Sequence, residues 1–255
     1  MSQGCFVWYE LMTTDVEAAR RFYGAVTGWT TQAWGDTGYT MWQLGDKGIG
    51  GVNVLSDEAK QMGAQPHWIA NITCDDVETT VAKAVSLGAM VLMPPTSMPT
   101  VGRFAVLMDP QGATFAAFCP ESEMGGDGPA AVGQFSWHEY YGADHGAAFE
   151  FYSALFGWNT TSSMDMGPMG VYQMYGIGER VLGGMMNKPP MMPVAAWNFY
   201  VRVEDLDSAI ARVTGNGGRL VMGPMEPPGG DRVATFMDPQ GAMFSLHQLA
   251  ADRAG

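Results

Sequence analysis

The sequence predicts an α+β protein built from four βαβββ units, which form two tandem domains. Three observations predict this fold class. First, residues 6–31 return as residues 135–160 with 12 of 26 positions identical. Second, a strand followed by a helix and further short strands starts twice in each copy. Third, the hairpin sequence DPQGA occurs at 109–113 and again at 238–242, with the same offset of 129 residues.

The repeat sets the domain boundaries. Residues 120–133 (PESEMGGDGPAAVG) are rich in glycine, proline and acidic residues and have no apolar period, which is typical of a linker. We therefore predict a first domain over residues 1–119 and a second domain over residues 134–255.

The first unit begins with a strand over residues 6–12, where apolar and polar side chains alternate. Asp15 is a suitable N-cap for the helix that follows. Apolar residues recur at three- and four-residue spacing until Gly28, which predicts that the helix ends there. Short strands are expected to complete the unit.

The second unit repeats this order. HWIANIT (67–73) predicts a strand, Asp76 is the expected N-cap of a helix ending at Gly88, and a strand follows at 90–93. A proline-rich loop is expected over residues 94–102, before a hairpin whose Asp-Pro-Gln-Gly suits a tight turn.

The charge and hydrophobicity of the chain limit the classes of partner that it is expected to bind. The chain has 13 basic and 26 acidic residues, a net charge of −13, which disfavours nucleic acid and anionic membrane surfaces and favours a cationic ligand. There is no run of eighteen apolar residues, so we expect no membrane span and a cytoplasmic protein.

These motifs resemble the vicinal oxygen chelate superfamily, which includes glyoxalase I, extradiol dioxygenases and bleomycin-resistance proteins. The resemblance rests on the DVEAARRFYGAVTGW helix, on the second helix with its LGA stop and on the DPQGAxF hairpin, and it covers nearly the whole chain twice. It implies that each pair of βαβββ units curls into a cup, and that metal-dependent members place their ligands on the first and last strands.

At those ligand positions this sequence departs from the family pattern. The first-strand positions fall on four tryptophans, and the last-strand positions fall on an alanine and a serine (Trp8, Trp68, Trp137 and Trp197; Ala116 and Ser245). Indole has no lone pair for a metal, so we predict no metal cofactor beyond a weakly held divalent ion. A one-residue slip in register would instead bring His67 and His138 into the cups.

The resemblance also places Glu10 and Glu139 inside the cups, two residues after Trp8 and Trp137. A carboxylate among Trp8, Trp68, Trp137 and Trp197 is the composition of a small-molecule site, and its burial suits it for proton transfer. The alternative is structural: each glutamate is paired with Arg103 or Arg232 and performs no chemistry.

His247 shares strand parity with Ser245, and copy one has Phe118 at the equivalent position. We therefore predict a glyoxalase-like enzyme in which Glu139 is the base, His247 is its partner and the ligand is an apolar or aromatic oxygenated compound. One alternative is a non-catalytic protein that sequesters an aromatic or cationic ligand, as bleomycin-resistance proteins do. Another is a scaffold whose cups are filled by its own side chains. The sequence does not predict the oligomeric state.

Overall fold

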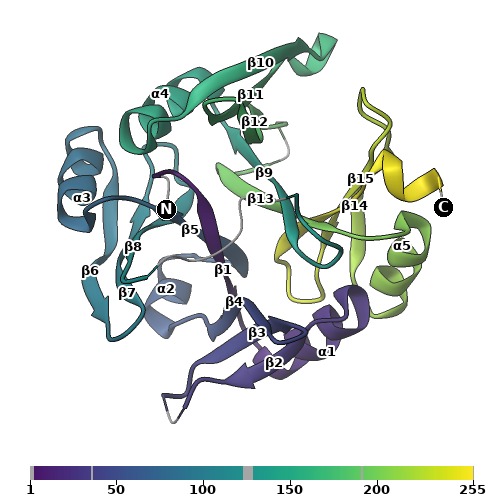
Figure 1. Ribbon diagram of the computed structural model, residues 1–255, viewed down its shortest axis with the longest axis horizontal. Helices are drawn as coiled ribbons and strands as arrows, with labels where there is room; N and C mark the ends of the chain where they lie inside the picture. The colour runs from purple at the N-terminus through teal and green to yellow at the C-terminus, as the bar shows by residue number, and fades with distance from the viewer. Residues whose placement is uncertain (1–2, 36, 123–128, 191, 255) are drawn as a thin grey trace. The chain divides into compact units, whose positions relative to one another are not determined.

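The computed structural model describes the chain except for residues 1–2, 36, 123–128, 191 and 255 (Figure 1). Part of the predicted linker therefore lies outside the described residues. The first copy contains β1 (Phe6–Thr13), α1 (Val16–Thr27), β2 (Thr30–Ala33), β3 (Thr40–Leu44), β4 (Lys47–Val54), α2 (Asp57–Gln61), β5 (His67–Thr73), α3 (Val77–Ser86), β6 (Met90–Met98), β7 (Gly102–Met108) and β8 (Thr114–Pro120). The second contains β9 (Phe135–Gly142), α4 (His145–Phe156), β10 (Asn159–Asp165), η1 (Gly167–Met169), β11 (Val171–Ile177), β12 (Arg180–Asn187), β13 (Ala196–Arg202), α5 (Leu206–Gly215), β14 (Arg219–Met225), β15 (Arg232–Met237), β16 (Met243–Gln248) and η2 (Ala250–Ala254).

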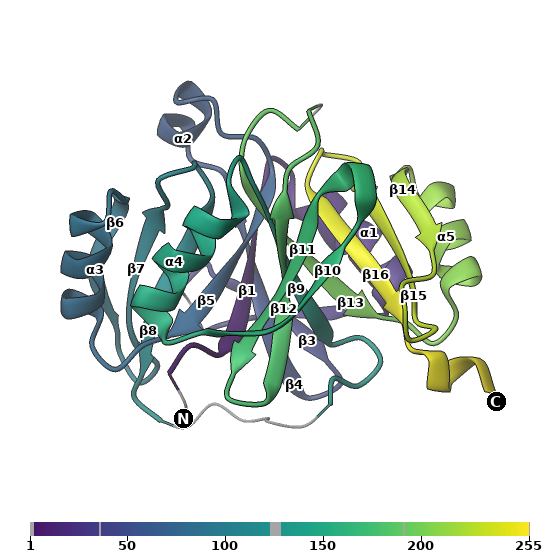
Figure 2. The same cartoon turned by 90° about the horizontal axis from the view of Figure 1, so that it is seen from above.

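Each sequence copy forms one eight-stranded mixed sheet. The strand order is β2-β3-β4-β1-β5-β8-β7-β6 in the first sheet and β10-β11-β12-β9-β13-β16-β15-β14 in the second. Helix α3 packs on β6, β7 and β8, and α5 packs on β14, β15 and β16 (Figure 2). The predicted α+β fold with four βαβββ units in tandem is therefore confirmed.

The helices begin and end where the sequence predicted. The side chains of Asp15 and Asp76 accept hydrogen bonds from the backbone amides of Ala18 and Thr79, and α1 ends at Gly28, whose φ is 76°. This left-handed conformation costs glycine little. Among the helices that the structure describes, none is long and apolar enough to cross a membrane.

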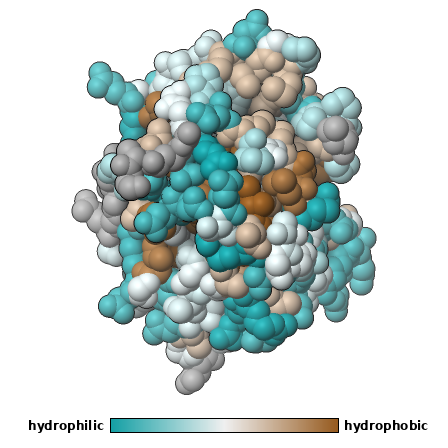
Figure 3. Space-filling view, turned by 90° about the vertical axis from the view of Figure 1, so that its right-hand side faces the viewer, coloured by the Kyte–Doolittle hydropathy of each residue, from teal (hydrophilic) through white to brown (hydrophobic). Residues whose placement is uncertain are grey.

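Strand β6 is longer than expected. The prolines at 94–95 were expected to begin a loop, but β6 continues to Met98 and its pairing with β7 skips them between Met93 and Thr96. Proline is tolerated there because β6 is an edge strand, whose outward N–H groups need no partner. The strand also exposes apolar side chains, such as Met90 at 57%. By contrast, the face in Figure 3 is mainly hydrophilic around a smaller hydrophobic area.

The chain forms two compact units that are discontinuous in sequence. Unit 1 comprises residues 1–8, 69–127 and 138–197, and unit 2 comprises residues 9–68, 128–137 and 198–255. Unit 1 contains α3 and α4, whereas unit 2 contains α1 and α5. Each unit thus combines one βαβββ repeat from each sequence copy, and the two units do not coincide with the two copies.

In unit 2 the hairpin turn between β15 and β16 contacts α1 and the residues just before it. The Tyr23 hydroxyl on α1 donates to the buried Asp238 carboxylate at 3.1 Å, and the Trp68 indole N–H donates to the Tyr23 hydroxyl at 3.1 Å. Gln240 Oε1 accepts the backbone N–H of Asp15 at 2.5 Å and that of Thr14 at 3.0 Å, just before α1 begins. The DPQG sequence therefore satisfies backbone donors at a helix start as well as forming a turn.

Unit 1 repeats this arrangement with residues 129 positions away. The Tyr152 hydroxyl donates to Asp109 at 3.0 Å, and the Trp197 indole N–H donates to the Tyr152 hydroxyl at 3.0 Å. Gln111 Oε1 accepts the backbone N–H of Asp144 at 2.9 Å, before α4. Both DPQGA sequences therefore hold a helix of the other sequence copy within their unit.

Candidate active site

The carboxylate of Glu10 lies on β1 beside Gly51 of the parallel strand β4. It is half-buried and accepts a hydrogen bond from the Tyr39 hydroxyl at 2.5 Å and one from Asn53 Nδ2 at 2.8 Å. A Cβ atom at Gly51 would lie 2.0 Å from the Tyr39 hydroxyl oxygen and 2.5 Å from Glu10 Oε2. Glycine at this position is therefore what allows the tyrosine and the carboxylate to meet.

Glu139 occupies the matching place in the second copy, beside Gly184 of β12. Its side chain is buried, and its carboxylate accepts a hydrogen bond from the Tyr141 hydroxyl. A Cβ atom at Gly184 would lie 2.1 Å from Cζ of Tyr172. A glutamate opposite a glycine, with a tyrosine ring lying over that glycine, is thus present in both copies.

The second donor to the carboxylate comes from a different strand in each copy. Met12 of β1 pairs with Asn53 of β4, and Asn53 is a donor to Glu10. At the equivalent pair in copy two, Tyr141 of β9 lies beside Met186 of β12, and here the first-strand residue is the donor. Each copy therefore places one methionine and one hydrogen-bond donor at this pair of positions, which keeps the carboxylate partnered.

The four predicted tryptophans differ in their exposure. Trp8 and Trp137 are partly exposed, as expected of residues that reach a ligand. Trp68 and Trp197 are only 4% and 5% exposed, and their indole N–H groups donate hydrogen bonds to tyrosine hydroxyls on helices α1 and α4. Both indoles are thus buried in the core, and the prediction that they line a ligand site stays a prediction.

The two arginines named as examples for the structural alternative have acidic partners on helices. Arg103 forms an ion pair with Glu78 at 2.5 Å, and Arg232 forms one with Asp207 at 2.9 Å. These arginines bind acidic residues of the neighbouring helices α3 and α5. The groups seen to hold Glu10 and Glu139 are tyrosine hydroxyls and an amide.

His247 lies in unit 2, whereas Glu139 lies in unit 1, and the pairing of these two residues stays a prediction. Both ring nitrogens of His247 have partners within unit 2. Nδ1 is 2.9 Å from Ser136 Oγ, and Nε2 is 3.0 Å from Asp231 Oδ2. No local sequence pattern connects Ser136 with its partners, because Asp231 lies 95 positions and His247 lies 111 positions further along the chain.

His138 and His67, the two residues that a one-residue register slip would bring into the cups, each contact a backbone carbonyl. His138 is buried, stacks on Phe6 with ring centroids 3.9 Å apart, and has Nδ1 2.7 Å from the carbonyl oxygen of Leu182. Burial lowers the pKa of His138 to about 4, so it is neutral at pH 7. His67 Nδ1 lies 2.7 Å from the carbonyl oxygen of Gln65, and burial lowers its pKa too.

The residues at the family's metal positions do not fit a tightly held divalent ion. Ala116 offers no donor atom, and the Ser245 hydroxyl is bonded to Asn198 Nδ2 and to Thr235 Oγ1, each at 2.8 Å. Over the described part of the chain, no group of three or more His, Cys, Asp or Glu side chains is placed to hold a metal. A site with three or four protein ligands cannot be built from these residues as they stand.

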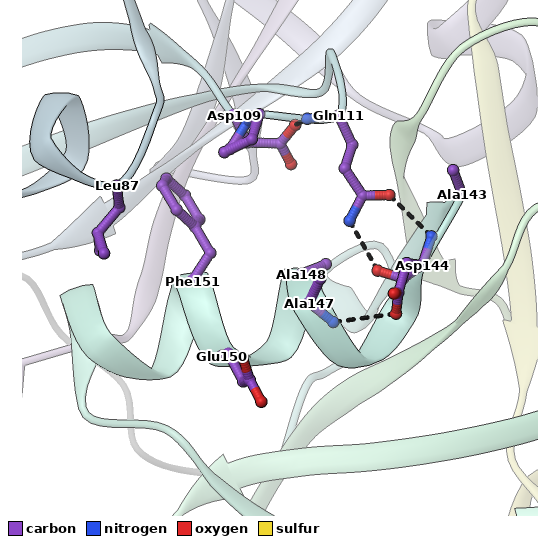
Figure 4. A pocket seen from close by; sticks show the side chains of 10 residues that line it. Leu87, Asp109, Gln111, Ala143, Asp144, Ala147, Ala148, Glu150 and Phe151 are labelled. Carbon is purple, nitrogen blue, oxygen red and sulfur yellow. Dashed lines mark hydrogen bonds between the residues drawn. The ribbon is translucent and has the colours of Figure 1, made fainter.

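A separate groove of about 470 Å³ lies in unit 1 beside the start of α4 (Figure 4). Its lining includes the apolar side chains of Leu87, Pro110 and Phe151, and the hydrogen bonds between Gln111 and Asp144 lie at its edge. The groove contains none of the site residues that the sequence predicted.

The site residues that the sequence did not identify are Tyr39, Asn53, Tyr141 and Tyr172. Their signal in the sequence was weak, because nothing local connects Tyr39 with a glutamate 29 positions earlier. The double glycines at 50–51 and 183–184 were the available signal. Glycine inside a strand often marks a place where another group approaches closely.

Comparisons with known proteins agree with this fold. Residues 8–118 match the model of the glyoxalase-like domain, and residues 134–246 match that of the Glyoxalase/Bleomycin resistance protein/Dioxygenase superfamily. The putative glyoxylase CFP32 of Mycobacterium tuberculosis is 32% identical over 249 residues, which cover 96% of this chain and 94% of the relative. This chain therefore belongs to the glyoxalase/bleomycin resistance protein/dioxygenase superfamily, with one such domain in each half.

Another relative is the anthracycline biosynthesis protein DnrV of Streptomyces peucetius, 28% identical over 271 residues, with 96% of this chain and 94% of the relative covered. Among solved structures, the 2,3-dioxygenase LapB of Pseudomonas sp. KL28 has a TM-score of 0.66 at 13% identity, covering 97% of this chain and 93% of that chain. The Mn(II)-bound glyoxalase of Novosphingobium aromaticivorans has a TM-score of 0.64 at 14% identity, covering 97% and 83%. At these identities the structures show the fold alone.

Proposed function

We propose that this protein is an enzyme that moves a proton to and from the carbon next to a carbonyl group in an aromatic, oxygenated small molecule. Glu139 is the base, and Tyr141 supplies the proton that stabilises the developing oxyanion. The observation that carries the proposal is the hydrogen bond from a tyrosine hydroxyl to a glutamate that pairs with a glycine of the neighbouring strand, which is present in both copies.

The chemistry follows from the two groups. Glu139 removes a proton from the substrate carbon, and the electron pair of that C–H bond moves to the carbonyl oxygen, giving an enolate. The neutral carboxyl group then holds the Tyr141 hydroxyl less strongly, so this hydroxyl donates to the enolate oxygen instead. Return of the proton to carbon completes the cycle without an oxidant, a reductant or a metal.

The proposed substrate class has two sources of support. The tyrosine rings near Glu139 suit an aromatic ligand, which such rings contact on their faces and edges. One relative is named for anthracycline biosynthesis, and anthracyclines are aromatic, oxygenated compounds. The expected pairing of Glu139 with His247 is not needed for this reaction.

The test is deuterium exchange in D₂O, followed by NMR with a panel of aryl ketones that carry a hydrogen on the carbon next to the carbonyl, such as 1-tetralone and 1-indanone. The wild-type protein should catalyse exchange at the carbon next to the carbonyl. Glu139→Gln should lower the rate by about 10²–10⁴-fold, as expected for loss of a general base. Failure of the wild type with the whole panel, or an unchanged rate in the variant, would overturn the proposal.

A second candidate is a binding protein that performs no chemistry. The net charge of −13 and the fact that Glu10 already has two hydrogen-bond donors favour it. In that case a cationic aromatic compound such as 9-aminoacridine should quench tryptophan fluorescence and be recovered unchanged. Its affinity should also fall as salt is added, because the attraction is electrostatic.

A further inference from the structure

Ser136, His247 and Asp231 form a continuous hydrogen-bonded chain inside unit 2. Ser136 Oγ is 2.9 Å from His247 Nδ1, and His247 Nε2 is 3.0 Å from Asp231 Oδ2. The other carboxylate oxygen of Asp231 accepts the backbone N–H of Ala250 at 2.8 Å. The carboxylate that orients the imidazole is therefore itself held in place.

The carboxylate sets the proton positions in this chain. A carboxylate only accepts hydrogen bonds, so the contact with Asp231 favours the tautomer in which His247 Nε2 donates and Nδ1 presents a lone pair to Ser136. The Ser136 hydroxyl can also donate to the carbonyl oxygen of Tyr200, but that distance is 3.3 Å against 2.9 Å to the imidazole. The imidazole nitrogen is therefore the nearer of the two acceptors for the serine hydroxyl.

The first copy acts as an internal control for this cluster. At the positions 129 residues earlier it carries Val7, Gly102 and Phe118. The strand pairing confirms the equivalence, because Phe118 pairs with Phe104 as His247 pairs with Val233. The same sheet therefore forms with none of the three polar groups, so the fold does not require them.

We propose that Ser136 is a nucleophile for acyl transfer, with His247 as its general base and Asp231 as the residue that positions His247. A hydroxyl within hydrogen-bond reach of a base that a third group orients is the arrangement that activates a serine. Ser136 is partly exposed, whereas His247 is nearly buried. The ligand class is a small carboxylic ester that can reach the exposed side of the serine.

The reaction balances without a further reagent. Ser136 Oγ bonds to the ester carbonyl carbon while its proton passes to His247 Nδ1. The carbon–oxygen bond to the alcohol then breaks, and the alcohol leaves with that proton. A water molecule, deprotonated by the same nitrogen, attacks the acyl-serine; the bond to Ser136 Oγ breaks as His247 returns the proton to that oxygen, and the carboxylic acid is released.

The test uses phenylmethanesulfonyl fluoride on the full-length protein, read by peptide mass spectrometry. Ser136 should gain the sulfonyl group with loss of fluoride. Ser136→Val should abolish this adduct, His247→Phe should slow its formation by about 10²-fold or more, and Asp231→Asn should slow it less. Valine and phenylalanine occupy these positions in copy one, so the variants should fold, which circular dichroism checks.

Ser97 supplies the matched control, because its hydroxyl accepts a hydrogen bond from Arg103 and has no histidine partner in that contact. Ser97→Ala should leave labelling of Ser136 unchanged. Hydrolysis of p-nitrophenyl acetate should fall in the same order as labelling. Absence of an adduct on Ser136 in the folded wild type, or an equal labelling rate in His247→Phe, would overturn the proposal.

Discussion

The hydroxyl of Tyr39 lies 2.5 Å from Oε1 of Glu10, in a contact that passes over the Cα atom of Gly51. In the second copy Tyr172 lies over Gly184, and Tyr141, two residues along the strand of Glu139, donates to the carboxylate. In this family fold, the glycine lies where a side chain would otherwise project beside the carboxylate. The hydrogen bond between Tyr39 and Glu10 therefore depends on the lack of a side chain at Gly51 on the neighbouring strand.

Gly51→Ala should separate Tyr39 from Glu10. Its Cβ atom would lie 2.0 Å from the Tyr39 hydroxyl oxygen, so the ring must move and the hydrogen bond is lost. Overpacking of this kind costs about 1–3 kcal/mol. Urea unfolding measures the cost, and Gly215→Ala in α5, where a Cβ atom meets nothing within 4 Å, should be neutral or stabilising. Equal stability of the two variants would contradict the close approach.

Tyr23→Phe should destabilise the protein by about 1–3 kcal/mol. The substitution removes the hydroxyl that donates to the buried Asp238 carboxylate and accepts from the Trp68 indole N–H. Thermal and urea unfolding measure this loss. The control is Arg20→Ala, which removes an exposed ion pair with Glu17 and should cost well under about 1 kcal/mol. A loss no larger than that of the control would show that the Tyr23 hydroxyl contributes little to stability.

Gln240→Ala should weaken the start of α1, because Gln240 Oε1 accepts the backbone N–H groups of Thr14 and Asp15. Loss of such a cap costs about 0.5–2 kcal/mol. Hydrogen exchange should become faster at the first turn of α1, while α4, which Gln111 serves, provides the internal control. Equal protection of α1 before and after the substitution would contradict this role.

The stability of the protein should rise between pH 4 and pH 6.5 because of His138. Burial lowers its folded-state pKa from 6.5 to about 4, so within this range the unfolded chain binds the proton and the folded chain does not. This contribution of His138 to the free energy of unfolding is fully present above the pKa of the unfolded state. It is lost as the pH falls toward 4 and amounts to at most about 3 kcal/mol.

His138→Phe should flatten this pH dependence, because the ring of the introduced phenylalanine can keep the stacking on Phe6 without a titrating group. Urea unfolding at several pH values measures the slope. The pKa of His67 is also lowered by burial, so a smaller slope of the same sign should remain. An unchanged slope in the variant would mean that other groups cause the acid sensitivity.

The sequence predicted the fold well because its signals are local. Asp15 and Gly28 delimit α1 through hydrogen bonds and backbone angles within one turn, and the repeat made the same elements visible twice. The site was harder, because its contacts join distant residues. Strand alternation could place Glu10 on a face, but it could not show that Tyr39 reaches it or that Trp68 turns toward Tyr23.

The repeat also concealed one feature of the chain. The offset of 129 residues correctly divides the sequence into two copies, yet each compact unit takes one βαβββ repeat from each copy. The DPQGA sequence predicts only a hairpin turn. In the structure Asp238 also contacts α1, and Gln240 contacts Asp15, which lies 225 positions earlier in the chain. Such contacts leave no trace in local spacing.

The most direct test of the proposed function is a double-mutant cycle on deuterium exchange into 1-tetralone, with Glu139→Gln, Tyr141→Phe and the double variant. If the two residues act as a pair, the double variant should be no slower than Glu139→Gln alone, because the tyrosine has no separate role once the base is lost. The corresponding cycle on Glu10 and Tyr39 reports on the other copy. Independent, multiplicative effects of the two substitutions, or exchange that neither of them slows, would contradict the account.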